Sequence, residues 1–285
     1  MILKILTLKI FQKKASFSLI LLIGILSIKC KGDHKKNNFE MQTGPSILNF
    51  SEADKLVDKT IIHSGGMKNW TSKKSLSYMK TIHSYDSLGS LIRSVNQSHK
   101  YQLRPFFKAN ISWEQDEKKH EIINNGNQSW KLVDGKIQLD ETSVNSAWNS
   151  SYGSHYILSM PFKFKDPGTI IRYEGLDTLL NNRIVHKLRI DYEKGAGSSG
   201  GMHTWYYFLN KDTYQFEATF LDYGEGYSYT DYETFIKIDD ILLTKERKLY
   251  SSNKNMELKY LKTQFKNLNI EFDLKLPEEL FKVNN

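Results

Sequence analysis

The chain has 285 residues, 39% of them hydrophobic and 25% charged, which is typical of a globular protein and not of a disordered, collagen-like or coiled-coil chain. Its single cysteine excludes an internal disulfide framework and any zinc or iron–sulfur site built from several thiolates. The net charge of +8 arises mostly at the start, because residues 1–29 hold five lysines and no acidic residue. The remaining 35 basic and 32 acidic residues nearly balance, so no nucleic-acid partner is expected.

Residues 1–29 have the pattern of a signal peptide. A basic segment, Met1 to Lys14, precedes an apolar run from Ala15 to Ile28. As a helix this run would reach about 21 Å, which is shorter than the roughly 30 Å hydrocarbon core of a bilayer. The pattern therefore predicts an export signal and not a membrane span.

Cys30 directly follows this leader, as the lipid-modified cysteine of a bacterial lipoprotein would. Lys29 stands where such proteins have a small residue, and a free thiol after ordinary cleavage is the alternative. Residues 30–45 are mostly polar, so they are expected to tether an acylated Cys30 to a single folded domain, residues 46–285. The predicted location is the cell envelope, with a lipid anchor in the outer membrane and the protein facing the periplasm.

Two helices are expected in the folded part. The first has one apolar face, formed at helical spacing by Ala53, Leu56, Val57, Thr60 and Ile61. Asn49 and Ser51 are its candidate N-caps, and the Gly65–Gly66 pair supplies a left-handed stop. The second is predicted over residues 145–158, although Gly153 weakens it.

Beyond Trp70 the apolar residues mostly alternate with polar ones, which is the period of a half-buried strand. The alternation is clearest in residues 105–113, 184–192 and 214–220. Turn-forming residues lie between the runs, at positions 86–89, 125–126, 134–135, 210–212 and 239–240. Short strands joined by tight turns favour antiparallel pairing, since parallel neighbours would need a helical crossover. The prediction is an α+β domain, mainly antiparallel, with about ten strands.

The strand expected over residues 205–209 is apolar on both faces, because Trp205, Tyr207 and Leu209 alternate with Tyr206 and Phe208. Such a strand must be covered on both sides. A curved half-barrel sheet with one or two helices packed on or in its concave face would cover it and leave an apolar interior.

The sequence GAGSSGG at residues 195–201 matches both a dinucleotide-binding fingerprint and a nucleophile elbow. Both motifs need a helix directly after the glycines. Residues 203–209 alternate as a strand instead, so the cluster is interpreted as a hairpin tip between Tyr192 and His203.

No metal, cofactor or catalytic site is expected. The eight histidines lack the spacing of a metal-binding motif, and His186 lies on the apolar face of its strand, as a partnered core histidine would. Three acidic pairs are candidates for glycosidase carboxylates: Glu114 with Asp116, Asp239 with Asp240, and Glu278 with Glu279. None of these pairs lies beside a predicted pocket.

Six large aromatic residues are candidates to line a hydrophobic ligand cavity: Trp70, Trp113, Trp148, Trp205, Tyr207 and Phe216. As core residues of an aromatic-rich β domain they would need no ligand, and this alternative stays open.

Three segments in combination resemble an uncharacterised family of Bacteroidota lipoproteins that is similar in fold to the LolA/LolB lipoprotein-carrier superfamily. They are His63-Ser64-Gly65-Gly66 with Trp70, residues 160–169 (MPFKFKDPGT), and residues 205–208 (WYYF) leading to residues 210–214 (NKDTY). The resemblance covers roughly residues 51–265. It implies an open antiparallel half-barrel wrapped around helices, with an apolar concavity that accepts acyl chains and with no catalytic residues.

The favoured function is therefore a cell-envelope lipoprotein that binds a lipid, an acyl chain or another hydrophobic ligand in the concavity. One alternative is a structural or partner-binding lipoprotein with a filled core. The other is an envelope enzyme that acts on glycans. A cavity of at least about 300 Å³ would favour the first over the second.

Overall fold

The computed structural model describes residues 46–197 and 201–283. The predicted signal peptide, Cys30 and the predicted tether lie outside the described residues. The helices of the described part are α1 (Ser46–His63), α2 (Met67–Ser72), α3 (Glu141–Leu158) and the 3-10 helices η1 (Phe162–Lys165) and η2 (Glu278–Phe281).

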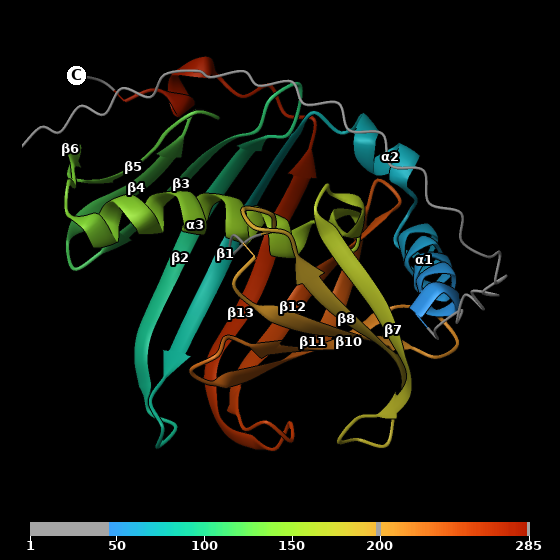
Figure 1. Cartoon of the computed structure of the whole chain (residues 1–285). Helices are drawn as coiled ribbons and strands as arrows, with labels where there is room; N and C mark the ends of the chain where they lie inside the picture. Colours follow the sequence, from blue (N-terminus) through green and yellow to red (C-terminus); the bar gives the residue numbers. More distant parts are fainter. Residues whose placement is uncertain (1–45, 198–200, 284–285) are drawn as a thin grey trace, which may run out of the picture. The chain divides into compact units, whose positions relative to one another are not determined.

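Thirteen strands form one continuous antiparallel sheet in the described part of the chain (Figure 1). The first six are β1 (Ser75–Tyr85), β2 (Leu91–Gln102), β3 (Lys108–Gln115), β4 (Lys118–Asn124), β5 (Ser129–Val133) and β6 (Lys136–Ile137). The others are β7 (Thr169–Thr178), β8 (Ile184–Tyr192), β9 (Thr204–Asn210), β10 (Phe216–Asp222), β11 (Tyr227–Ile238), β12 (Ile241–Ser252) and β13 (Leu258–Phe272).

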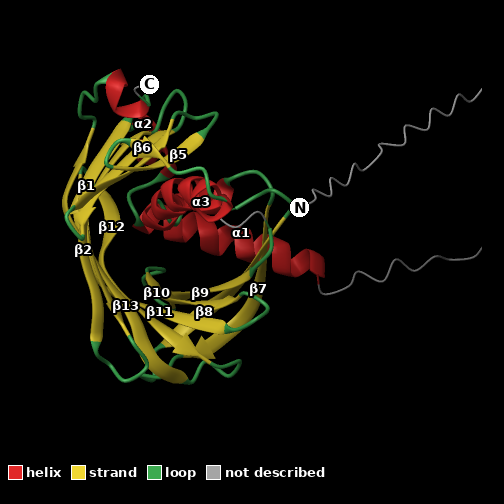
Figure 2. Ribbon diagram, turned by 90° about the vertical axis from the view of Figure 1, so that its left-hand side faces the viewer, coloured by secondary structure: helices red, strands yellow, loops and turns green. Residues whose placement is uncertain are grey.

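The sheet consists of two meanders, β6 to β1 and β13 to β7, which join where β1 pairs with β13. This is the one pairing between strands that are not consecutive in the described chain, with Leu76 opposite Phe272 and Ile82 opposite Phe265. Figure 2 shows the sheet curving around α1 and α3, which lie on its concave side. The predicted α+β half-barrel is therefore confirmed.

The strand count is higher than the predicted ten or so, and it includes the two-residue strand β6, which is too short for an alternating pattern to mark it. The predicted hairpin turns are confirmed. At the β11–β12 turn, Asp239 and Asp240 both have positive φ, as a tight two-residue hairpin requires.

Helix α1 ends where the sequence predicts, but it begins at Ser46 and not at the predicted caps Asn49 or Ser51. The Gly66 N–H donates to the Ile61 carbonyl across 2.8 Å, which closes the last turn. A side chain at Gly65 would collide with the backbone carbonyl of Asp240, 2.1 Å from the position of its Cβ. Glycine is thus required where α1 meets the β11–β12 turn.

Helix α3 is longer than predicted, because Asp140 caps it. The Asp140 side chain accepts a hydrogen bond of 2.9 Å from the Ser143 N–H. The helix packs against β3, β4 and β5, and its far side faces across the concavity toward the second meander (Figure 2).

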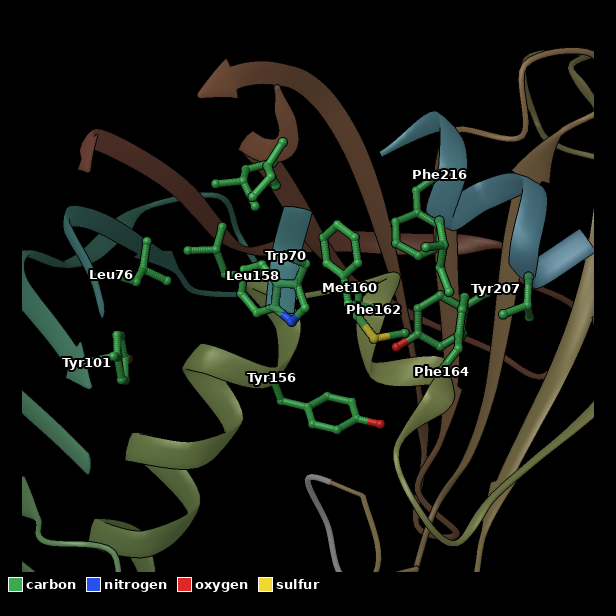
Figure 3. Close-up of a cluster of buried hydrophobic side chains, with 14 of the residues drawn as sticks. Trp70, Leu76, Tyr101, Tyr156, Leu158, Met160, Phe162, Phe164, Tyr207 and Phe216 are labelled. Carbon is green, nitrogen blue, oxygen red and sulfur yellow. The ribbon is translucent and has the colours of Figure 1, made fainter. Parts of the chain in front are cut away.

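The main hydrophobic core lies where the two meanders, α1, α2 and the end of α3 converge (Figure 3). Trp70 of α2, Phe162 of η1, Tyr156 of α3 and Leu76 of β1 meet there. A second cluster, which includes Phe208, Phe220 and Tyr229, lies on the other face of β9. The doubly apolar strand is therefore covered on both faces, as predicted.

The glycine-rich segment leads from β8 into β9, which pair antiparallel, with Ile190 opposite Trp205. A strand, β9, and not a helix follows Gly201, so the described residues lack the helix that a dinucleotide-binding turn or a nucleophile elbow needs.

Candidate functional site

A cavity of about 550 Å³ lies between α3 and the concave face of the sheet. Side chains from both meanders line it, so it exists only because the sheet curves. Its volume falls within the range of roughly 300–1,000 Å³ that is typical of pockets for small-molecule ligands.

One stripe of α3 forms a wall of this cavity. Its members are Ser146, Asn149, Ser150, Gly153, Ser154 and Ile157. They recur at three- and four-residue spacing and therefore share one helix face. All but Ile157 are small or polar, so the helix leaves space between itself and the sheet. An added Cβ at Gly153 would meet no atom within 4 Å.

The sheet supplies most of the apolar wall. These side chains are Ile82, Ile111, Trp113, Ile122, Trp205, Leu221, Leu249 and Phe265. Tyr207 and Tyr232 contribute aromatic surface with a polar tip.

The charged side chains that line the cavity are all basic: Lys80, Arg93, Lys131 and Arg247. Among the described residues, no aspartate or glutamate lines it. Lys80 of β1 and Arg247 of β12 are both only 7% exposed. The Lys80 ammonium donates to the Ser154 hydroxyl across a long 3.4 Å.

Burial strongly perturbs Lys80. Desolvation disfavours its charged form, and the nearby Arg247 charge adds to this, so its pKa falls to about 7. His99 on the neighbouring strand β2 is held neutral, because burial lowers its pKa well below the usual value. Its ring nitrogens lie 2.7 Å from the Tyr101 hydroxyl and 3.1 Å from the Gln97 side-chain oxygen.

The structure brings together only three of the six predicted cavity residues. Trp113, Trp205 and Tyr207 line the cavity. Trp70 and Phe216 lie instead in the main core, where Trp70 stacks on Phe162 and Phe216 packs edge-on against Phe164.

Trp148 does not line this cavity either. It lies on the opposite side of α3 from the stripe that faces the cavity and is 42% exposed. Its position on the helix turns it toward the surface, because a residue two positions after Ser146 points to another side of α3.

Lys80 and Arg247 are the site residues that sequence reasoning missed. Both side chains point to the concave face from strands whose residues alternate between the two faces. In β1, Lys80 lies between Tyr78 and Ile82, the alternate residues that are also buried. Arg247 likewise precedes Leu249 in the inward phase of β12. A basic residue in the apolar phase of a strand is the signal that could have identified them.

The acidic pairs all lie away from the cavity. Asp239 forms a 2.8 Å ion pair with Lys73, and Glu278 pairs with Lys108. His186 has a partner, as predicted, with its Nδ1 3.0 Å from the Tyr173 hydroxyl, but it is half-buried and not a core residue. Within residues 46–197 and 201–283, no three His, Cys, Asp or Glu side chains cluster as metal ligands would.

None of the helices in the described part of the chain is both long and apolar enough to cross a membrane.

Comparison of the sequence with models of known families identifies the family of this chain. The profile of a family of unknown function, DUF6503, matches residues 119–271, which is more than half of the chain. The chain belongs to the DUF6503 family. The matched region runs from β4 to β13 and contains α3 and most of the cavity wall. No curated protein sequence matches this DUF6503 chain.

Solved structures share its fold. A domain assigned as an outer membrane lipoprotein-sorting protein, from Vibrio parahaemolyticus, has a TM-score of 0.51 at 10% identity, covering 82% of this chain and 97% of its own. A LolA superfamily protein from Nitrosomonas europaea has a TM-score of 0.50 at 9% identity, covering 81% of this chain and 97% of its own. The resemblance to the LolA superfamily is confirmed at the level of the fold.

Proposed function

We propose that this DUF6503 protein is a cell-envelope lipoprotein that binds a lipid, an acyl chain or another hydrophobic ligand in the cavity beside α3. The observation that carries the proposal is the cavity of about 550 Å³ with isoleucine, leucine, tryptophan and phenylalanine walls. Each ligand methylene moved from water into such a site contributes about 0.8 kcal/mol. An acyl chain would therefore bind there by its apolar surface.

The cavity also weighs against the two alternatives. A structural protein with a filled core has no need of a space this large between α3 and the sheet. A glycan-acting enzyme needs two carboxylates in its cleft, whereas the charged side chains that line this cavity are all basic.

The same proposal includes attachment to a membrane. The leader and Cys30 support an acyl anchor, with the folded domain facing the periplasm from the outer membrane. A fold shared with a protein assigned to lipoprotein sorting is consistent with this location. The proposal needs no cofactor and no catalytic step.

The test uses delipidated protein and the neutral fluorescent probe N-phenylnaphthylamine. A Gly153→Trp variant should fill the cavity, because Gly153 faces open space on its wall. Asn145→Trp is the matched control, since it places the same side chain at an exposed position of α3 that does not line the cavity.

Wild type and Asn145→Trp should enhance the fluorescence of the probe, and Gly153→Trp should not. Native mass spectrometry of protein purified from its own host should also show a bound lipid that is released on denaturation. No probe uptake by the wild type at high micromolar concentration, together with no bound lipid, would refute the proposal.

A further inference from the structure

Charged side chains on the two faces of strands β12 and β13 differ in whether they have acidic partners. On the outer face, cations have acidic partners: Lys266 lies 2.8 Å from Glu246, and Lys248 lies 2.5 Å from Glu233. On the inner face, the adjacent Arg247 makes no ion pair or side-chain hydrogen bond with any described residue. The Arg247 charge is therefore left uncompensated by the described residues.

Arg247 and Lys80 form one cationic centre. The Arg247 guanidinium lies 3.9 Å from the ring centre of Phe265, and the Lys80 ammonium lies 5.1 Å from the same ring centre. The two groups are thus within about 9 Å of each other. A carboxylate or phosphate placed between them could contact both.

Among residues 46–197 and 201–283, no side chain next to Arg247 supplies a negative charge. The titratable groups around Arg247 are Tyr78, Tyr207 and Tyr232, and burial raises the pKa of each, so they remain neutral phenols. The residues of α3 that line the cavity are uncharged. The other charged side chains on the cavity wall, Arg93 and Lys131, are also basic.

Arg247 cannot lower the cost of its buried charge by losing a proton, because a guanidinium stays charged in proteins. A buried charge without a partner is costly, and its cost is removed by a bound counter-charge. The interior of this cavity is thus suited to a ligand that has both an apolar chain and an anionic group.

We propose that the ligand is an anionic amphiphile whose carboxylate or phosphate headgroup binds between Lys80 and Arg247, with its chain along the apolar wall. This inference rests on the proposed function, since it specifies the chemical class of ligand for the same cavity. The headgroup forms charge-assisted hydrogen bonds with both cations, and both cations also contact the Phe265 ring.

Three ligands of equal chain length separate the headgroup from the chain: dodecanoate, dodecyl phosphate and dodecanol. Each is titrated against wild-type protein preloaded with N-phenylnaphthylamine, and displacement gives its affinity. At least one of the two anions should bind about tenfold or more tightly than the alcohol. The stronger of the two identifies the headgroup as a carboxylate or a phosphate.

The variants Lys80→Met and Arg247→Met test the assignment to these residues. Each should weaken binding of the preferred anion by about tenfold or more and leave the affinity for dodecanol within about twofold. Lys248→Met is the matched control, because it removes the same charge from the residue next to Arg247 on the outer face. It should change neither affinity.

The outcomes distinguish this inference from the proposed function. If the probe and all three ligands fail to bind, the proposed function fails. If the probe binds but the alcohol and both anions bind equally well, the cavity is an apolar site and the headgroup inference is overturned. The ligand comparison needs only wild-type protein, so it decides the question even if a variant does not fold.

Discussion

Trp70 and Phe162 stack face to face, with 4.9 Å between ring centres and 4° between ring planes. The contact joins α2 to η1 in the main core, away from the cavity (Figure 3). Both rings are almost completely buried, so truncating either removes a large apolar surface and leaves a void.

Phe162→Ala should therefore lower the free energy of unfolding by about 3–5 kcal/mol. Trp148→Ala is the control, because Trp148 is half exposed, and it should cost much less. Urea unfolding followed by circular dichroism measures both. Equal costs for the two variants would show that the Trp70 and Phe162 stack is not part of a packed core.

Gly153 should be replaceable by alanine with a gain in stability. Its Cβ position is open, and glycine inside a helix costs about 0.5–1 kcal/mol relative to alanine. Gly153→Ala should raise the free energy of unfolding by about that amount and retain uptake of N-phenylnaphthylamine. A loss of stability would mean that the space beside α3 is filled.

The buried lysine should make the stability of the ligand-free protein depend on pH. The pKa of Lys80 is about 7 in the folded protein and near 10.5 in the unfolded chain. Between these values the unfolded state binds more protons, so the free energy of unfolding rises with pH. Below pH 7 both states carry the charge, and the folded state bears the full cost of burying it.

The Lys80→Met variant should lack this contribution of Lys80 to the pH dependence of the free energy of unfolding. The stability of wild type minus that of the variant should increase between pH 7 and 10 by on the order of 1 kcal/mol per pH unit. The other groups that face Lys80 are Arg247, which stays charged throughout, and His99, which stays neutral. A difference that does not change with pH would show that Lys80 is not desolvated.

The tryptophans should report on ligand position. Trp113 and Trp205 line the cavity, whereas Trp70 lies in the core and Trp148 lies near the surface. Because bromine quenches tryptophan only at short range, dibrominated stearic acid should quench wild-type fluorescence. Trp113→Phe and Trp205→Phe should each reduce the quenched fraction, and Trp148→Phe should not. Equal loss for all three would place the ligand elsewhere.

The anchor prediction concerns Cys30. Mass spectrometry of the membrane fraction should find this residue acylated, and Cys30→Ser should release the protein into the soluble fraction, because its acyl chains are then absent. Identical membrane location of wild type and Cys30→Ser would contradict it.

The sequence by itself determined the local elements of this fold. The Gly65–Gly66 stop of α1, the turn at Asp239 and Asp240, and the doubly apolar strand β9 all follow from preferences that act over a few residues. The antiparallel class follows from them too, since tight turns leave only antiparallel neighbours.

Only the tertiary structure decided what the concave face contains. The pairing of β1 with β13 joins segments nearly two hundred residues apart, and no local pattern marks it. Trp70 and Trp205 are the same residue type, yet Trp70 lies in the core and Trp205 lines the cavity. Whether an inward side chain packs against a neighbour or borders a cavity depends on the sizes of all the side chains that the curved sheet brings together. For the same reason, the inward cations Lys80 and Arg247 become one centre only after their strands have paired on either side of β13.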